Sequence, residues 1–209
     1  MSTGSSIILE IQYLPSIQYF SKLKRFEKVL IEQHEHYNKG SYRNRAHIAS
    51  ANGLERLSIP LVKGKNEQQP IRETKIAWYE PWAKRHWQAI HSAYGNAPFF
   101  DYYEDELRPY FMQQYTYLFD WNLELILKIH RLLELDSKLI FTETYHREVP
   151  DGIIDFRNSI APRAKVNVPD PYFTEIPYAQ VFMEKHGFLS GLSILDLLFC
   201  TGPEAISYL

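Results

Sequence analysis

Apolar runs and apolar stripes alternate along the first part of the chain. The apolar residues of 7–14 predict a strand, which Pro15 ends. Ser16 is a typical helix N-cap, and apolar residues spaced by three after it predict a short helix. The segment 28–32 predicts a second strand, and the polar, glycine-containing segment 37–45 predicts a loop.

The next segment has the pattern of a β-hairpin. A short strand at 46–50 is followed by an Asn-Gly pair at 52–53, which is a strong signal for a tight turn. Apolar residues then alternate with polar ones over 57–61, which predicts the returning strand. The polar segment 62–70 predicts a loop, and 71–78 predicts another strand.

Helical periodicity dominates the centre of the chain. Pro81 suits the first turn of a helix that runs to residue 94, and the segments 102–113 and 117–135 predict two more helices. Segment 138–145 returns to strand character, and Ser193 is expected to begin a closing helix.

The interleaving of strands and helices predicts the fold class α/β. We expect a single layered domain over 1–209, with a mixed sheet, flanking helices and a C-terminal helix that closes the core. Segment 150–177 contains five prolines and is expected to be irregular.

Composition narrows the class of protein. Of the 209 residues, 45% are apolar, which excludes a disordered chain. The net charge of −2 argues against a nucleic-acid partner. The single cysteine, Cys200, excludes an internal disulfide, and no secretory signal or membrane span is apparent. These features predict a cytoplasmic location. The 15 tyrosines, each with an apolar ring and a polar hydroxyl, suit a partly solvated cleft as well as the periphery of a hydrophobic core.

A basic and aromatic loop is the strongest local candidate for a binding site. It contains Lys39, Tyr42, Arg43, Asn44 and Arg45. Arginine forks match phosphate or carboxylate oxygens, and tyrosine and asparagine add directed hydrogen bonds. This loop therefore predicts a site for an anionic substrate such as a nucleotide diphosphate. The alternative is a solvated loop whose arginines pair with nearby acids.

His86 is the first candidate for catalysis. A histidine titrates near neutral pH and serves as a general acid or base. Trp82 lies one helical turn before it and is assigned to substrate binding. The alternative is a packed, hydrogen-bonded histidine on a half-buried helix face.

Asp196 is the second catalytic candidate. It is the one charged residue in the apolar run 192–200, where an unpaired carboxylate would be costly. The spacing Ser193-x-x-Asp196 predicts a capping box, with the carboxylate facing the first helical turn. The alternative is a catalytic base at Asp196 or a nucleophile at Ser193.

The end of the second strand offers a candidate metal site. If that strand continues, Glu32, His34 and His36 share one face and form the ligand set of a facial triad. The favoured interpretation is a polar strand end, so no metal ligand is assigned, and the identity of any cofactor stays open. The chain also lacks G-x-G-x-x-G, P-loop, G-x-S-x-G, H-E-x-x-H and C-x-x-C motifs, which disfavours the enzyme classes that carry them.

Several segments, in order, are similar to the WbqC-like family, bacterial proteins often associated with surface-polysaccharide (O-antigen) loci. The matching segments are Tyr13-Leu14-Pro15 with Tyr19-Phe20, the 39–45 loop with Asn52-Gly53 and Ser58-Ile59-Pro60, Trp82-x-x-x-His86 with Ala93-Tyr94 and Ala97-Pro98-Phe99-Phe100, and 192–199 with Gly202-Pro203. Leu9-Glu10-Ile11 replaces the family's frequent His-Gln-Pro, so a role that rests on that histidine does not transfer. The stretch at about 136–178 is short and divergent.

The resemblance implies a transferase that acts on a nucleotide-sugar or surface-polysaccharide precursor, with acyl or glycyl decoration as one form. Under this hypothesis the 39–45 loop holds the substrate, His86 is the base, and these side chains converge on one cleft. The alternative is a non-catalytic binding or assembly protein in cell-envelope biogenesis, with a flat exposed aromatic patch. Donor, acceptor and homo-oligomeric state stay open.

Overall fold

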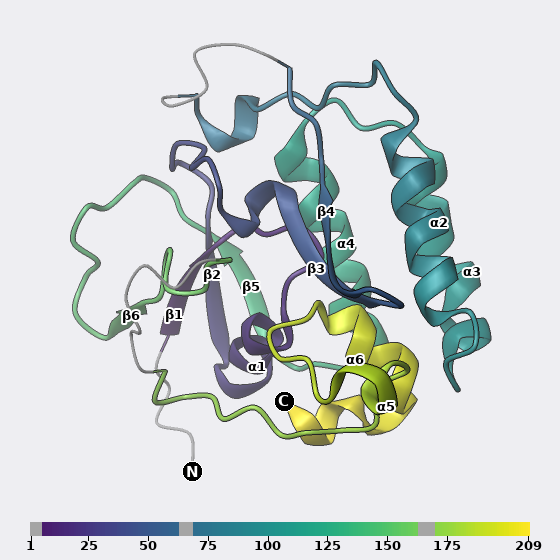
Figure 1. Cartoon of the computed structure of the whole chain (residues 1–209). Helices are drawn as coiled ribbons and strands as arrows, with labels where there is room; N and C mark the ends of the chain where they lie inside the picture. The colour runs from purple at the N-terminus through teal and green to yellow at the C-terminus, as the bar shows by residue number, and fades with distance from the viewer. Residues whose placement is uncertain (1–5, 63–68, 163–169) are drawn as a thin grey trace.

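The fold is described from a computed structural model, which covers residues 6–62, 69–162 and 170–209. Its centre is a four-stranded parallel sheet with the order β5-β2-β1-β6 (Figure 1). The strands are β1 (Ser6–Glu10), β2 (Lys28–Glu32), β5 (Lys138–Phe141) and β6 (Ile153–Asp155).

The two faces of the sheet carry different side chains, and the strand register shows which residues lie on each face. Ile7 pairs with Val29 and Leu9 with Ile31, and these four side chains are fully buried. The residues between them point to the opposite face because side chains alternate along a strand. On that opposite face Glu10 pairs with Glu32, so two acids stand side by side where the central strands end.

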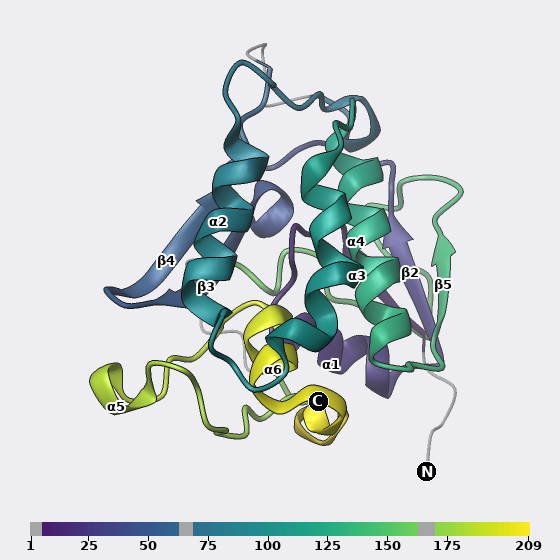
Figure 2. The ribbon, with the colours of Figure 1, turned by 90° about the vertical axis from the view of Figure 1, so that its right-hand side faces the viewer.

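Helices cover one side of the sheet. In Figure 2 the helices lie to one side of β2 and β5. The helices are α1 (Ile17–Arg25), α2 (Trp82–Tyr94), α3 (Phe100–Met112), α4 (Leu118–Leu132), α5 (Met183–His186) and α6 (Ile194–Thr201), with 3-10 turns η1 (Tyr42–Asn44), η2 (Ile71–Glu73) and η3 (Gly202–Tyr208). None of the helices in the described part of the chain combines the length and apolar character that a bilayer crossing requires.

The predicted hairpin is present as β3 (Arg45–Ser50) and β4 (Gly53–Ser58), which pair antiparallel. The hairpin packs against α2 and α6. The Ser193 N–H, at the start of α6, donates to the His47 carbonyl at 2.7 Å. Residues 194–199 of α6 are all buried, so the expected C-terminal closing helix and the α/β class are confirmed.

Three predicted elements need correction. The first strand ends at Glu10 rather than at residue 14, because the chain turns there and Leu14 adopts a positive φ of 38°. The strand predicted at 71–78 is wrong. This segment forms η2 and makes two isolated β-bridges, at Lys75 and Ile76, but no continuous strand pairing. The irregular segment 150–177 contains β6, which the sequence did not predict. Most of the 62–70 loop lies outside the described residues.

Candidate functional site at the carboxyl edge of the sheet

The strand order creates a switch point between β1 and β6. The chain passes from β1 to β2 and then β5 on one side, and returns on the other side of β1 as β6. In open parallel sheets, ligands bind outside the carboxyl ends of the strands at such a point. Glu10 and Gln12 reach this edge from β1, and Arg157 and Asn158 reach it from β6.

A continuous polar network joins the two sides of the switch point. Gln12 Nε2 donates to Glu10 Oε1 at 2.7 Å, and the Asn158 backbone N–H donates to Glu10 Oε2 at 2.8 Å. Arg43 Nη2 donates to Asn158 Oδ1 at 3.0 Å. Glu10 is only 1% exposed. Its two carboxyl oxygens therefore meet directed donors inside the fold.

Arg43 connects this network to Glu35. Arg43 Nε donates to Glu35 Oε1 at 2.7 Å, and Nη2 donates to Oε2, which makes the pair bidentate. Burial raises the pKa of Glu35 to about 7, although Arg43 opposes the shift, and the charges of Glu10 and Glu32 raise it further. A buried carboxyl with a pKa near 7 has the property that a general acid or base requires.

A second group of contacts extends the site toward β5. Glu32 Oε1 accepts hydrogen bonds from Thr142 Oγ1 at 2.9 Å and from the His34 backbone N–H at 2.8 Å. Glu32 Oε2 pairs with Arg157 Nη1 at 3.0 Å, and Arg157 also contacts Asp155. We call Glu10, Gln12, Glu32, Glu35, Arg43, Arg157 and Asn158 the edge cluster.

Two buried atoms of the edge cluster lack a hydrogen bond. Among the residues that the structure describes, neither Gln12 Oε1 nor Arg43 Nη1 has a partner. Such atoms are costly to bury unless a water or a ligand satisfies them. Backbone strain lies beside them, because Leu14 and Asn158 have φ values of 38° and 60°. Strained residues concentrate at functional sites, where the surrounding fold holds them.

The predicted substrate loop divides into structural and exposed residues. The Tyr42 hydroxyl lies 3.1 Å from His47 Nδ1, and Asn44 Nδ2 donates to the Ile59 carbonyl at 2.9 Å. Lys39 is exposed and Arg45 is half-buried. Arg43 is therefore the member of the loop that the structure places in the edge cluster.

His86 lies in an aromatic cluster. Its Nδ1 is 2.9 Å from the Tyr13 hydroxyl, and its ring packs against Trp82, which in turn packs against Trp121. Burial lowers the pKa of His86 to about 4, against the smaller effect of a hydrogen bond with the Ser58 backbone. His86 is neutral at pH 7 and contacts Tyr13 rather than the 39–45 loop. Trp82, with its N–H on the Ala77 carbonyl at 3.0 Å, belongs to the same packed cluster.

Asp196 forms a separate buried network. Ser193 is the N-cap of α6, as predicted, and its Oγ accepts from the Leu195 N–H at 3.3 Å. The expected capping role of Asp196 is wrong. Its carboxylate accepts hydrogen bonds from the hydroxyls of Tyr94 (2.9 Å) and Tyr178 (2.6 Å), and burial raises its pKa. Tyr94 lies eight residues beyond His86 on α2, about 12 Å along the axis, so the two catalytic candidates are not adjacent.

The facial-triad alternative does not form a ligand set. The strand stops at Glu32, whose carboxylate is taken by Thr142, His34 N–H and Arg157. The His34 ring contacts the Thr142 carbonyl, and His36 forms a backbone bridge to Pro70. Across the described ranges, no group of three histidine, cysteine or acidic side chains is placed to hold a metal ion.

The sequence predictions missed most of the edge cluster. Glu10 and Glu32 carried a signal, since each is an acid that directly follows an apolar strand. Glu35 is not singled out by the sequence, where it lies between His34 and His36. Arg157 and Asn158 carried none, because the strand that places them has three residues within a proline-rich segment.

An open parallel sheet with buried acids and arginines at its carboxyl edge defines an α/β protein with a polar site at a strand switch point. The chain belongs to the WbqC-like protein family, whose model matches residues 11–169. It is 30% identical over 225 residues to the uncharacterized protein Rv1507c of Mycobacterium tuberculosis, a match that covers 97% of this chain and 96% of the relative. No solved structure matches this chain with statistical significance.

Proposed function

We propose that the protein is a transferase that modifies a hydroxyl or amino group of a nucleotide sugar or another surface-polysaccharide precursor. The reaction takes place at the edge cluster. One observation carries the proposal: Glu35, a buried carboxyl with a pKa near 7, is held by Arg43 at the switch point of a parallel sheet. The family's association with polysaccharide loci, noted from the sequence, supports the substrate class.

Glu35 serves as the acid–base group, in place of the predicted His86. Its carboxylate accepts the proton of the acceptor O–H or N–H while that oxygen or nitrogen forms a bond to the transferred group. The bond from the transferred group to its leaving group breaks, and the proton passes to the leaving group or to water. Arg43 positions the carboxylate through the bidentate pair, and it is a positioning residue in this scheme.

The charge of the edge cluster selects the part of the substrate that enters it. The edge cluster contains three acidic side chains, Glu10, Glu32 and Glu35, and two arginines that already pair with them. Hydroxyl and amino groups suit this environment better than a diphosphate does. Gln12 Oε1 is an acceptor and Arg43 Nη1 a donor for them. A diphosphate belongs instead beside Lys39 and Arg45, at the surface of the same loop.

The test is product formation by Glu35→Gln. Nucleotide sugars are incubated with acyl and aminoacyl donors, and mass spectrometry detects the mass gained by the acceptor. Glutamine keeps the shape but cannot accept a proton, so we expect the rate to fall about 10²- to 10⁴-fold while the acceptor still binds. Glu27→Gln is the matched control, because Glu27 is an exposed glutamate directly before β2.

The outcomes separate the two functions. Product formed by wild-type protein and by Glu27→Gln, but not by folded Glu35→Gln, supports the proposal. An unchanged rate in Glu35→Gln removes Glu35 from the chemistry. Binding of a precursor without any product from wild-type protein overturns the transferase and favours the binding-protein alternative.

A further inference from the structure

A hollowed surface lies between α2 and α3, apart from the edge cluster. One hollow of about 320 Å³ is lined by residues that include Trp78, Pro81, Phe111 and Gln114. A second hollow of about 350 Å³ is lined by residues that include Trp87, Gln88 and His91. Both hollows are lined by Lys84 and Met112, so they adjoin and form one groove along the two helices.

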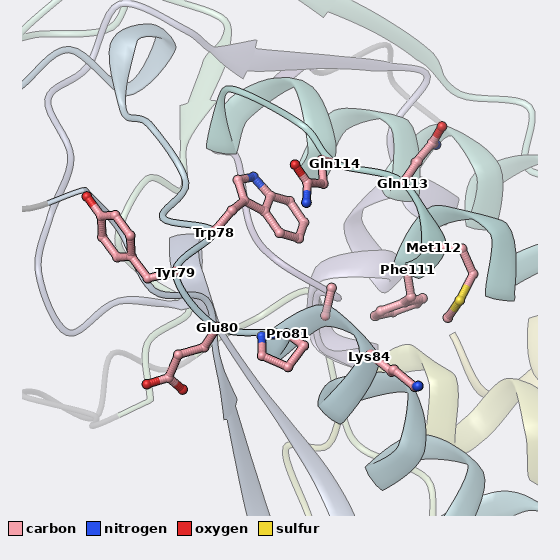
Figure 3. Close-up of a pocket in the computed structure, with 10 residues that line it drawn as sticks. Trp78, Tyr79, Glu80, Pro81, Lys84, Phe111, Met112, Gln113 and Gln114 are labelled. Carbon is pink, nitrogen blue, oxygen red and sulfur yellow. The ribbon is translucent and has the colours of Figure 1, made fainter.

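We propose that this groove binds a saccharide chain, with one sugar ring on Trp78 and the chain continuing toward Trp87. The proposal goes beyond the function proposed above and does not depend on it. Figure 3 shows Trp78, Pro81 and Phe111 around the first hollow, with Gln114 and Lys84 at its edge, while Tyr79 and Glu80 point away.

The Trp78 side chain is a rigid platform. Its Nε1–H donates to the Tyr115 carbonyl at 2.8 Å, and its ring packs on Trp82 with centroids 4.8 Å apart. The ring is therefore fixed before a ligand arrives, which lowers the entropy cost of binding. A flat apolar ring face suits the C–H face of a pyranose, which is apolar while its edge carries hydroxyls.

The polar residues around this platform match hydroxyl groups. A sugar hydroxyl both donates and accepts hydrogen bonds, and the Gln114 and Gln88 amides do the same. Lys84, between the two hollows, adds a donor for a hydroxyl or for a sugar carboxylate. The charges along the groove are mixed, since Glu80 pairs with Arg85 and Glu104 with Arg108. This argues against a nucleic-acid strand, which requires a basic groove.

The groove has the size of a ligand site. Each hollow falls near the lower end of the range of small-molecule sites, about 300–1,000 Å³. The first hollow combines aromatic rings with two glutamines, whereas the second is lined mainly by polar and charged side chains such as Gln88 and Ser92. Two such hollows in series fit a chain of repeating units better than one compact molecule. An oligosaccharide is such a chain, and each of its units carries hydroxyl groups for the polar side chains.

The test is a titration followed by intrinsic tryptophan fluorescence. The probes are linear hexasaccharides, one neutral glucan and one galacturonate, together with a proline-rich peptide. We expect at least one hexasaccharide to bind. Gln114→Ala and Lys84→Ala, both exposed positions, should each weaken it about fivefold to tenfold without loss of folding. Lys138→Ala is the matched control for Lys84→Ala, because Lys138 is an exposed lysine on β5 that lines neither hollow.

Binding that Gln114→Ala and Lys84→Ala weaken and Lys138→Ala does not supports the groove. The proposal is overturned if neither hexasaccharide binds, if both alanine variants bind as wild type does, or if the peptide binds in place of the sugar. Glu35→Gln should leave hexasaccharide binding unchanged, so failure here and failure of the transferase proposal are separate results.

Discussion

Arg43 and Glu35 form a bidentate ion pair in which neither side chain is more than 7% exposed. Lys39 is exposed and Arg45 is half-buried, so Arg43 is the cation through which the 39–45 loop is anchored. The sequence suggested a phosphate-binding arginine here, or a local pair with an acid. The structure has the second arrangement, inside the molecule instead of in a solvated loop.

We therefore expect Arg43→Ala to destabilise the fold strongly. The substitution leaves the buried Glu35 carboxylate without its partner, which typically costs about 3–5 kcal/mol of unfolding free energy. Urea denaturation measures the loss. Lys39→Ala, an exposed cation of the same loop, should stay within about 0.5 kcal/mol of wild type. A loss below about 1 kcal/mol for Arg43→Ala would mean that the pair is solvated.

His86 gives the stability a pH dependence at acidic pH. Its folded pKa of about 4 lies below the unfolded value of about 6.5. The unfolded state thus binds more protons between these values, and the unfolding free energy falls as the pH is lowered from 6.5 to 4. His86→Gln should flatten this slope by up to about 1.4 kcal/mol per pH unit.

Urea titrations across this pH window measure the slope for wild type, His86→Gln and His146→Gln. His146→Gln removes an exposed histidine and is the control for the substitution itself. An equal slope in all three proteins would show that His86 titrates as a solvated histidine does.

Glu35 changes the unfolding free energy with pH in the opposite direction to His86, between about pH 4.5 and 7. Its folded pKa of about 7 lies above the ordinary value of 4.5, so the folded state binds the extra proton. The stability that this protonation contributes is complete below pH 4.5 and is lost as the pH rises through 7. The difference in unfolding free energy between wild type and Glu35→Gln should therefore shift against wild type as the pH rises from 5 to 7.5. A difference that is constant with pH would contradict the raised pKa.

Asp196 is expected to be structural, not catalytic. Asp196→Asn weakens two hydrogen bonds that tyrosine hydroxyls donate to a carboxylate, and each such bond contributes about 1.5–3 kcal/mol. Tyr178→Phe should lose one of them, and Tyr145→Phe, at an exposed tyrosine, should lose little. Thermal unfolding compares the three variants. An Asp196→Asn protein of wild-type stability would leave the network without a structural role.

Gly202 marks a close contact between the end of α6 and the α2–α3 connection. It has a φ of 58°, and a Cβ there would collide with the Phe99 ring. Gly152 has a φ of 87° but open space around it. Gly152→Ala tests backbone strain alone, so Gly202→Ala should be clearly the less stable of the two in urea. Equal losses would mean that the Phe99 ring moves aside freely.

The sequence predicted the elements whose own pattern decides their structure. The long central helices and the N-caps Ser16 and Ser193 follow from periodicity and capping chemistry, and the structure confirms them. Two elements depend on distant partners instead. β6 becomes a strand by pairing with β1, and 71–78 is buried by neighbouring segments without forming a strand.

The candidate site was harder to predict for the same reason. Arg43 stood out by its residue type, but its partner Glu35 was hidden between histidines. Asn158 lies 148 residues beyond Glu10, and a contact over that separation leaves no periodic signal. Asp196 was noticed as a charge in an apolar run, but its tyrosine partners lie on other segments.

The brevity of β6 has a consequence for the native-state dynamics. Three residues hold Arg157 and Asn158 in place, while β5, β2 and β1 form the rest of the sheet. Local opening of β6 would separate these two side chains from Glu10 and Glu32 and leave the remaining strands paired. Amide hydrogen exchange should therefore be faster in β6 than in β1. A ligand that binds at the edge cluster should slow exchange first in this strand, although β6 lies far along the chain from β1 and β2.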